Sequence, residues 1–169
     1  IFQSSELTIK YSKTNNGIIF EDKDKNIILN QIPNSLKAEP SVQEKIIYDE
    51  KSAHVEETAN GKVTVKDIIR RDTIGRSTRY YVSFSSQNEK ALYGLGSHME
   101  DYLNLVGKTL YLTQHNLKAM LPMLCSTNGY GLLFDAGCAM KFKNDGSITT
   151  MQLEGAKTLD YYFIKGATS

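Results

Sequence analysis

Short runs of β-branched and aromatic residues recur along the whole chain, and most of them are followed by glycine, asparagine, aspartate or serine. Examples are "LTIKY", "YYVSFS", "GLLFD" and "YYFIKG". Residues of these types fit the pleated, half-buried surface of a sheet, while the turn-forming residues between them let the chain reverse. On the order of a dozen such runs predict an all-β fold, an antiparallel sandwich larger than an immunoglobulin domain.

Two stretches set the expected strand boundaries. The run "RSTRYYVSFSS" alternates in polarity, which predicts a strand with Val82 and Phe84 on its buried face and Tyr81 and Ser83 on the other. Further upstream, Asn60-Gly61 is expected to turn a hairpin, because both central residues of a type I′ turn need positive φ. We expect strands before and after it, and an irregular segment earlier in the chain. The expected strands are 45–50, 53–58 and 62–69, and the irregular segment is 34–40.

Charge and hydropathy exclude two classes of partner. Twenty Lys and Arg residues balance nineteen Asp and Glu residues, and no basic block could follow a row of phosphates, so nucleic acid is not expected to bind. The densest apolar run, Ala119 to Cys125, contains Pro122 and is too short for a membrane span. The N-terminus shows no signal peptide, which leaves export undecided, with a periplasmic or extracellular location slightly favoured over the cytoplasm.

The two cysteines, Cys125 and Cys138, both have apolar neighbours in the sequence. Free cysteine packs as a small hydrophobic residue, so we expect two buried thiols, with a single bridge as the minority alternative. Two cysteines cannot build a zinc quartet or a disulfide framework. The three histidines show no metal-binding spacing either, so neither a metal nor another cofactor is expected.

The stretch "GLGSHME" has the residue types of an active centre. However, Ser97 is not the centre of a G-x-S-x-G elbow, and adjacent residues on a strand point to opposite faces. The expected role of Gly94 and Gly96 is therefore an unusual dihedral or a close backbone approach. No two carboxylates form an evident facing pair, so no catalytic residue is expected in the chain.

Gln114, His115 and Asn116 follow the strand-like run "GKTLYLTQ" and open a loop that re-enters the sheet at "MLPMLCS". Imidazole and carboxamide groups at such a loop can form hydrogen bonds with sugar hydroxyls. An ordinary polar loop remains the alternative at this point.

Several motifs in the second half of the chain occur together in a known family. They run in this order: Glu89 with Tyr93 to Gly96, Leu103 to Lys108, Gln114 to Asn116, Pro122, Gly129 to Gly131, and Asp160 to Phe163. This ordered set resembles the N-terminal domain of glycoside hydrolase family 31, which includes α-glucosidases and α-xylosidases. The first half of the chain agrees only as a strand-rich lead-in.

The resemblance implies a galactose-mutarotase-like β-sandwich, or supersandwich, that occupies residues 1–169 and packs on a catalytic (β/α)8 barrel. The family's two catalytic aspartates lie on that barrel, so the chain alone is expected to be inactive. In the family the loop corresponding to Gln114, His115 and Asn116 helps form the leaving-group side of the pocket. The implied partner is an α-linked oligosaccharide shared with the barrel, and the apolar surface left without a barrel would favour self-association.

Two other function classes remain open. A free-standing carbohydrate-binding module would present aromatic side chains to sugars, for which Tyr80, Tyr81 and Tyr102 are candidates. An aldose 1-epimerase would need a histidine acid and a glutamate base, for which His98 and Glu100 are the nearest pair.

Overall fold

Antiparallel strands make up most of the computed structural model, which describes residues 1–59 and 61–166. These residues include no α-helix, only the short 3-10 helix η1 (Glu50–Ser52). The strands form a nine-stranded, a four-stranded and a two-stranded sheet, and neighbouring strands such as β11 and β12, β8 and β14, and β6 and β7 pair antiparallel. The expectation of an all-β antiparallel sandwich is therefore confirmed.

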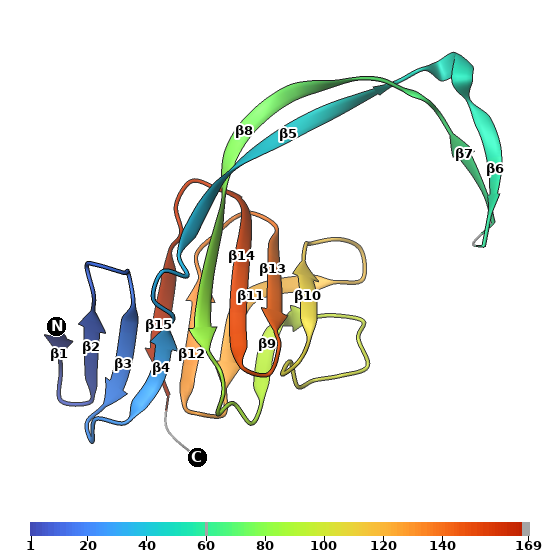
Figure 1. The fold of residues 1–169 in the computed structure, drawn as a ribbon. Coiled ribbons are helices and arrows are strands. Elements are labelled where there is room, and N and C mark those ends of the chain that lie inside the picture. The colour runs from blue at the N-terminus through green and yellow to red at the C-terminus, as the bar shows by residue number, and fades with distance from the viewer. Residues whose placement is uncertain (60, 167–169) are drawn as a thin grey trace. The chain divides into compact units, whose positions relative to one another are not determined.

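The nine-stranded sheet has the order β1-β2-β3-β4-β8-β14-β13-β10, with β5 also paired to β8 (Figure 1). Its strands are β1 (Phe2–Gln3), β2 (Leu7–Tyr11), β3 (Ile18–Asp22), β4 (Ile27–Gln31), β5 (Lys37–Tyr48), β8 (Ile68–Ser85), β10 (Thr109–Leu112), β13 (Met140–Asn144) and β14 (Ile148–Ala156).

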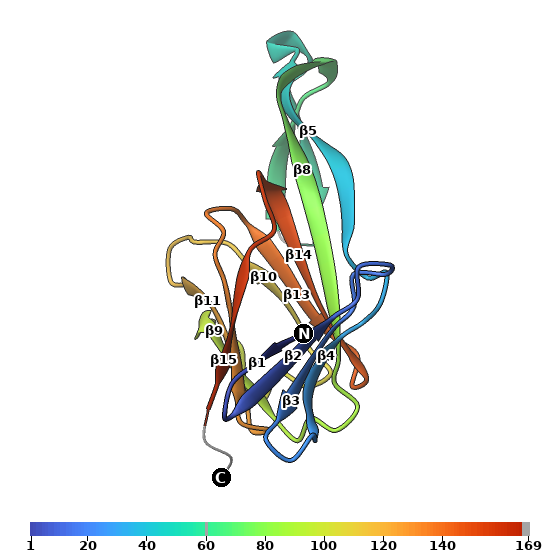
Figure 2. The ribbon, with the colours of Figure 1, turned by 90° about the vertical axis from the view of Figure 1, so that its left-hand side faces the viewer.

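The four-stranded sheet has the order β15-β12-β11-β9. Its strands are β9 (Leu92–Ser97), β11 (Ala119–Ser126), β12 (Tyr130–Phe134) and β15 (Tyr161–Lys165). Figure 2 shows β9, β11 and β15 on the opposite side of the molecule from β4 and β8. The two sheets therefore form the layers of the sandwich.

Aromatic side chains join the two layers. The rings of Phe20 on β3 and Phe163 on β15 stack with 4.0 Å between their centroids. Phe84 on β8 meets Phe134 on β12 edge to face at 6.5 Å. Val82 and Phe84 are completely buried, so the expected alternation along "RSTRYYVSFSS" is confirmed. The core lies between the sheets and is built from alternate residues of both.

The described chain divides into two units by its internal contacts: residues 1–39 with 78 onward, and Pro40–Ser77. The second unit contains η1, parts of β5 and β8, and the two-stranded sheet of β6 (His54–Thr58) and β7 (Gly61–Val65). Thr58 pairs with Gly61, so the hairpin is confirmed, although Asn60 of its expected turn lies outside the described residues. Most side chains of this unit are exposed.

Three expectations for the local structure are corrected. Residues 37–40 are not irregular but begin β5, where Pro40 is tolerated because β5 pairs only with β8 among the described residues. The strand expected over 45–50 ends at Tyr48, since the Asp49 side chain accepts a hydrogen bond from the Lys51 amide and starts η1. The strand expected over 62–69 is interrupted between β7 and β8.

The expectation of two buried thiols is wrong for Cys125, which is exposed, while Cys138 is half-buried. Cys125 lies on β11 opposite Tyr93 and Gly131, with its side chain on the outer face of the four-stranded sheet. That face is as apolar as the inner one, so apolar neighbours in the sequence did not indicate burial. Both thiols are free, and burial raises the pKa of Cys138.

Candidate functional site

The loop between β10 and β11 holds the three residues proposed to meet a sugar. Gln114 spans the base of this loop: its Nε2 donates to the Lys118 carbonyl oxygen at 2.7 Å, and its Oε1 accepts from the Met120 amide at 3.0 Å. The carboxamide of Gln114 is thus already hydrogen-bonded at both ends. Its geometry suits the role of a clamp that fixes the loop.

His115 and Asn116 lie at the exposed tip of the same loop. The Lys118 amide donates to the His115 carbonyl at 3.1 Å, and Leu117 takes a left-handed φ of 70°, which makes the turn tight. His115 Nδ1 lies 2.9 Å from the Asn116 carbonyl oxygen, which leaves Nε2 facing away from that bond. The Asn116 carboxamide forms no hydrogen bond with any residue in the described part of the chain. Both side chains can therefore reach a ligand outside the domain.

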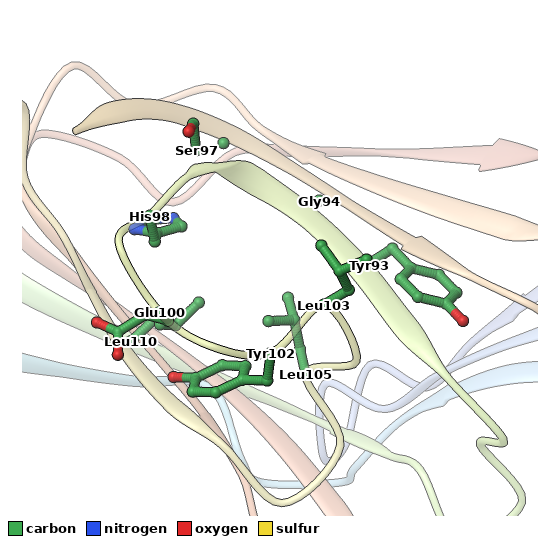
Figure 3. A pocket seen from close by; sticks show the side chains of 10 residues that line it. Tyr93, Gly94, Ser97, His98, Glu100, Tyr102, Leu103, Leu105 and Leu110 are labelled. Atoms are coloured by element: carbon green, nitrogen blue, oxygen red, sulfur yellow. The ribbon is translucent and has the colours of Figure 1, made fainter. Parts of the chain in front are cut away.

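A second feature is a hollow beside β9, which we call the β9 hollow (Figure 3). Its polar lining residues are Ser97, His98, Glu100 and Tyr102, and its apolar wall includes Leu103, Leu105 and Leu110. In Figure 3, His98, Glu100 and Tyr102 extend from the loop that follows β9, while the ring of Tyr93 points away from that loop.

The imidazole of His98 is fixed by the backbone of its own turn. His98 Nε2 lies 2.7 Å from the Leu95 carbonyl oxygen, which can only accept, so Nε2 carries the proton in the neutral ring. His98 Nδ1 is then an acceptor, and it is buried without a hydrogen-bond partner among the described residues. No hydrogen bond joins Ser97 to His98 in that part of the chain, so the pair lacks the geometry of an activated nucleophile.

The β9 hollow adjoins the β10–β11 loop. Ser97 lines the β9 hollow and also a shallower hollow formed by residues 114–119. Lys118 Nζ lies 3.4 Å from Glu100 Oε1 and so bridges the two features. Burial raises the pKa of Tyr102, and the negative charge of Glu100 raises it further. Lys108 Nζ stands 4.6 Å from the centre of the Tyr102 ring.

Gly94 and Gly96 allow the backbone of β9 to lie close to that of β11. Their φ angles are 105° and 100°, and a Cβ built on Gly94 would lie 2.3 Å from the Met123 carbonyl oxygen. The register of β9 and β11 is irregular between Met120 and Leu124. The expectation of unusual dihedrals and a close backbone approach is confirmed.

The tyrosines considered as sugar platforms do not form one surface. Tyr80 and Tyr81 are consecutive on β8 and point to opposite faces of the sheet. The Tyr80 hydroxyl donates to the Lys157 carbonyl oxygen at 3.1 Å, and the Tyr81 hydroxyl donates to Glu39 at 3.2 Å. Tyr102, in contrast, lines the β9 hollow together with the exposed Leu103.

Within residues 1–59 and 61–166, no group of three or more His, Cys, Asp or Glu side chains is arranged to hold a metal ion. No helix there is long and apolar enough to cross a membrane.

Comparison with curated proteins finds a relative of this chain. The chain is 33% identical over 88 residues to an uncharacterised family 31 glucosidase from Pseudescherichia vulneris. That match covers 50% of the chain and 16% of the glucosidase, so the chain spans about a sixth of that relative. No protein-family model matches the chain. The chain is related to glycoside hydrolase family 31.

Solved family 31 structures share the fold. The α-xylosidase from Xanthomonas citri matches 83% of this chain with a TM-score of 0.59 and 18% identity. A family 31 α-xylosidase from a soil metagenome, complexed with xylose, matches 99% with a TM-score of 0.61 and 16% identity. The cycloalternan-forming enzyme from Listeria monocytogenes matches 97% with a TM-score of 0.65 and 18% identity. The chain covers 12%, 25% and 14% of these three proteins, respectively.

Proposed function

We propose that the chain serves as the non-catalytic β-sandwich domain of a retaining family 31 α-glycosidase, of α-glucosidase or α-xylosidase type. In this role it packs on a catalytic (β/α)8 barrel and lines the substrate entrance with His115 and Asn116. The barrel supplies both catalytic carboxylates. The observation that carries the proposal is the outer face of the four-stranded sheet.

That outer face is apolar across its whole width. One row of directly paired residues runs Tyr93, Cys125, Gly131 and Ile164, and the next runs Met123, Leu133 and Tyr162. These rows contain no charged side chain. Tyr162 is 52% exposed and Ile164 is 44% exposed. Alternate residues of the same strands, such as Leu124 and Leu132, are completely buried in the core.

The outer face of the nine-stranded sheet has the opposite character. One of its rows runs Tyr81, Gln152, Lys141 and Tyr111, and the next runs Ser83, Thr150, Lys143 and Thr109. Lysine, threonine and glutamine side chains dominate it, as expected of a face in water. The two outer faces therefore differ in chemistry although both are exposed here. A contiguous apolar face of this kind marks an interaction surface.

β11 connects the apolar face to the β10–β11 loop. The strand follows the loop directly at Ala119, and it then presents Met123 and Cys125 on the apolar face. A barrel docked on that face would therefore lie next to the loop that carries His115 and Asn116. This continuity supports a single role in which docking and entrance lining occur together.

The full-length gene product provides the test. Tyr162→Lys with Ile164→Lys places two charges on the docking face, so we expect soluble enzyme yield and α-glycosidase activity to fall together. The matched control is Tyr111→Lys on the polar face, which should leave both unchanged. If the reading frame stops at codon 169, or if the 169-residue chain alone releases sugar from α-glycosides, the proposal is wrong.

A further inference from the structure

We infer that the β9 hollow is a binding site for a neutral pyranose unit, at the edge of the face proposed to dock a barrel, with which it shares Tyr93. The inference rests on the side chains of the hollow itself, and it holds whether or not the chain docks on a barrel.

Four polar groups around the hollow lack strong partners within the described residues. The hydroxyls of Ser97 and Tyr102 form no hydrogen bond there, and His98 Nδ1 is an acceptor without a donor. Glu100 has one oxygen in a long contact with Lys118, at 3.4 Å, and the other oxygen free. Ser97 and Glu100 are exposed, whereas His98 and Tyr102 are half-buried. A buried polar atom is normally paired, so the unpaired His98 Nδ1, together with three neighbouring groups open to hydrogen bonds, indicates a ligand with several hydroxyls.

The wall of the hollow can pack against the C–H face of a sugar ring. Leu103 is 84% exposed, whereas Leu105 and Leu110, which also line the hollow, are only 4% and 3% exposed. The ring of Tyr102 is held in place by Lys108 at 4.6 Å. Apolar walls combined with a few converging polar groups are typical of small-molecule sites.

The charge of the hollow favours a neutral ligand. Glu100 is the charged residue among those that line the hollow, and Lys118 balances it, so the lining itself presents no unopposed charge. A carboxylate can accept hydrogen bonds from two neighbouring hydroxyls, which suits a sugar diol. Because Ser97 also lines the hollow at the β10–β11 loop, a sugar bound here could belong to an oligosaccharide that extends toward Asn116.

The test is an amide-resolved NMR titration of the 169-residue chain with isomaltotriose, maltotriose, xylobiose and, as a charged control, glucuronate. We expect saturable shifts confined to the amides of residues 96–103 with at least one neutral sugar, with a Kd on the order of 1 mM. Glucuronate should bind more weakly. Absence of saturable shifts up to tens of millimolar sugar, or shifts centred elsewhere, would overturn the inference.

Variants separate binding from folding. Leu103→Ser changes an exposed side chain and cannot open the core. Tyr102→Ala removes the aromatic ring from the hollow. Each variant should weaken sugar binding about tenfold. The control is Tyr111→Ala, since Tyr111 is also exposed and has Lys141 at 4.9 Å from its ring. Its affinity should match that of the parent chain. If Leu103→Ser binds as tightly as the parent with an unchanged amide spectrum, the assignment is wrong. Loss of sugar binding in these variants would leave barrel docking intact, so the two proposals fail separately.

Discussion

Gly96 lies so close to Ala119 that a Cβ built on Gly96 would be 2.0 Å from the Ala119 carbonyl oxygen. Real Cβ atoms do not approach a backbone oxygen this closely, so β9 and β11 can pair at this point only because residue 96 has no side chain. The same segment then forms the loop that lines the β9 hollow. The glycine therefore sets the position of the candidate sugar site.

Gly96→Ala should lower the free energy of unfolding by about 3 kcal/mol, because it adds a backbone clash to a strained φ. Gly146→Ala is the matched control: Gly146 also has a positive φ, 93°, but nothing lies within 4 Å of its Cβ position. That change should cost only about 1 kcal/mol. Urea unfolding of both variants measures the difference, and equal costs would mean that the clash is relieved.

Phe163 and Tyr162 are neighbours on β15 with opposite orientations, which allows a direct test of the two layers. Phe163→Ala removes the ring stacked on Phe20 and should destabilise the chain by about 3 kcal/mol. Tyr162→Ala changes only the outer face and should stay within about 0.5 kcal/mol. Thermal unfolding compares them, and similar losses would contradict the assignment of inner and outer faces.

Tyr130 should make the stability of the fold sensitive to alkaline pH. Its hydroxyl donates to Glu89, and burial followed by that carboxylate raises the pKa of Tyr130 far above its ordinary value. Burial also raises the pKa of Tyr161. The unfolded chain releases these protons near pH 10, while the folded chain retains them. The free energy of unfolding should therefore be insensitive to these groups below about pH 10 and fall as the pH rises further.

Urea unfolding between neutral and alkaline pH measures that slope, and tyrosinate absorbance follows the ionisation. Tyr130→Phe should reduce the alkaline slope, whereas Tyr111→Phe, at an exposed site, should leave it unchanged. If all ten tyrosines of the folded chain ionise at the same pH, the raised pKa values of Tyr130 and Tyr161 are wrong.

The isolated chain should self-associate through the apolar outer face of the four-stranded sheet. Light scattering at increasing concentration should show an average mass that rises above that of a monomer. Tyr162→Lys with Ile164→Lys should restore the monomer, and Lys141→Ala on the polar face should not. A parent chain that stays monomeric at high concentration would contradict this prediction.

The Gln114 side chain should keep the β10–β11 loop ordered. Gln114→Ala removes the acceptor of the Met120 amide, so hydrogen exchange at Met120 should become faster, by about tenfold for a loss of about 1.4 kcal/mol. Asn116→Ala, in the same loop, should leave that rate unchanged. Equal exchange in both variants would show that the clamp adds nothing to loop order.

The sequence was most informative where the two faces of a strand differ in chemistry. Along "RSTRYYVSFSS" the polar residues point outward into water, so the alternation identified Val82 and Phe84 as core residues. In "MLPMLCS" and "YYFI" both faces are apolar, and period-two alternation disappears from the sequence. For that reason the exposure of Cys125 could not be predicted. The family resemblance implied an uncovered apolar surface but did not locate it on these strands.

The candidate site was predictable only in part. The position of the β10–β11 loop followed from the turn residues around it and from the order of the family 31 motifs. The Gln114 carboxamide forms hydrogen bonds with the Lys118 carbonyl and the Met120 amide, and these bonds depend on how the loop closes. Residue types alone do not determine that closure. Likewise, Tyr102 and Leu103 line one hollow with Ser97 of β9 and Leu110 of β10 only because of the path that the chain takes between these two strands.

Met123 covers the backbone of Gly131 at the centre of the apolar face, where its terminal methyl group would lie only 2.6 Å from a Cβ built on the glycine. Methionine is flexible and polarisable, and the space under it is empty of side chain. Rotation of one thioether can thus deepen or fill the middle of the face without moving a strand. The centre of the apolar face can therefore change its shape to fit a partner surface by a side-chain rotation, while the backbone beneath it stays in place.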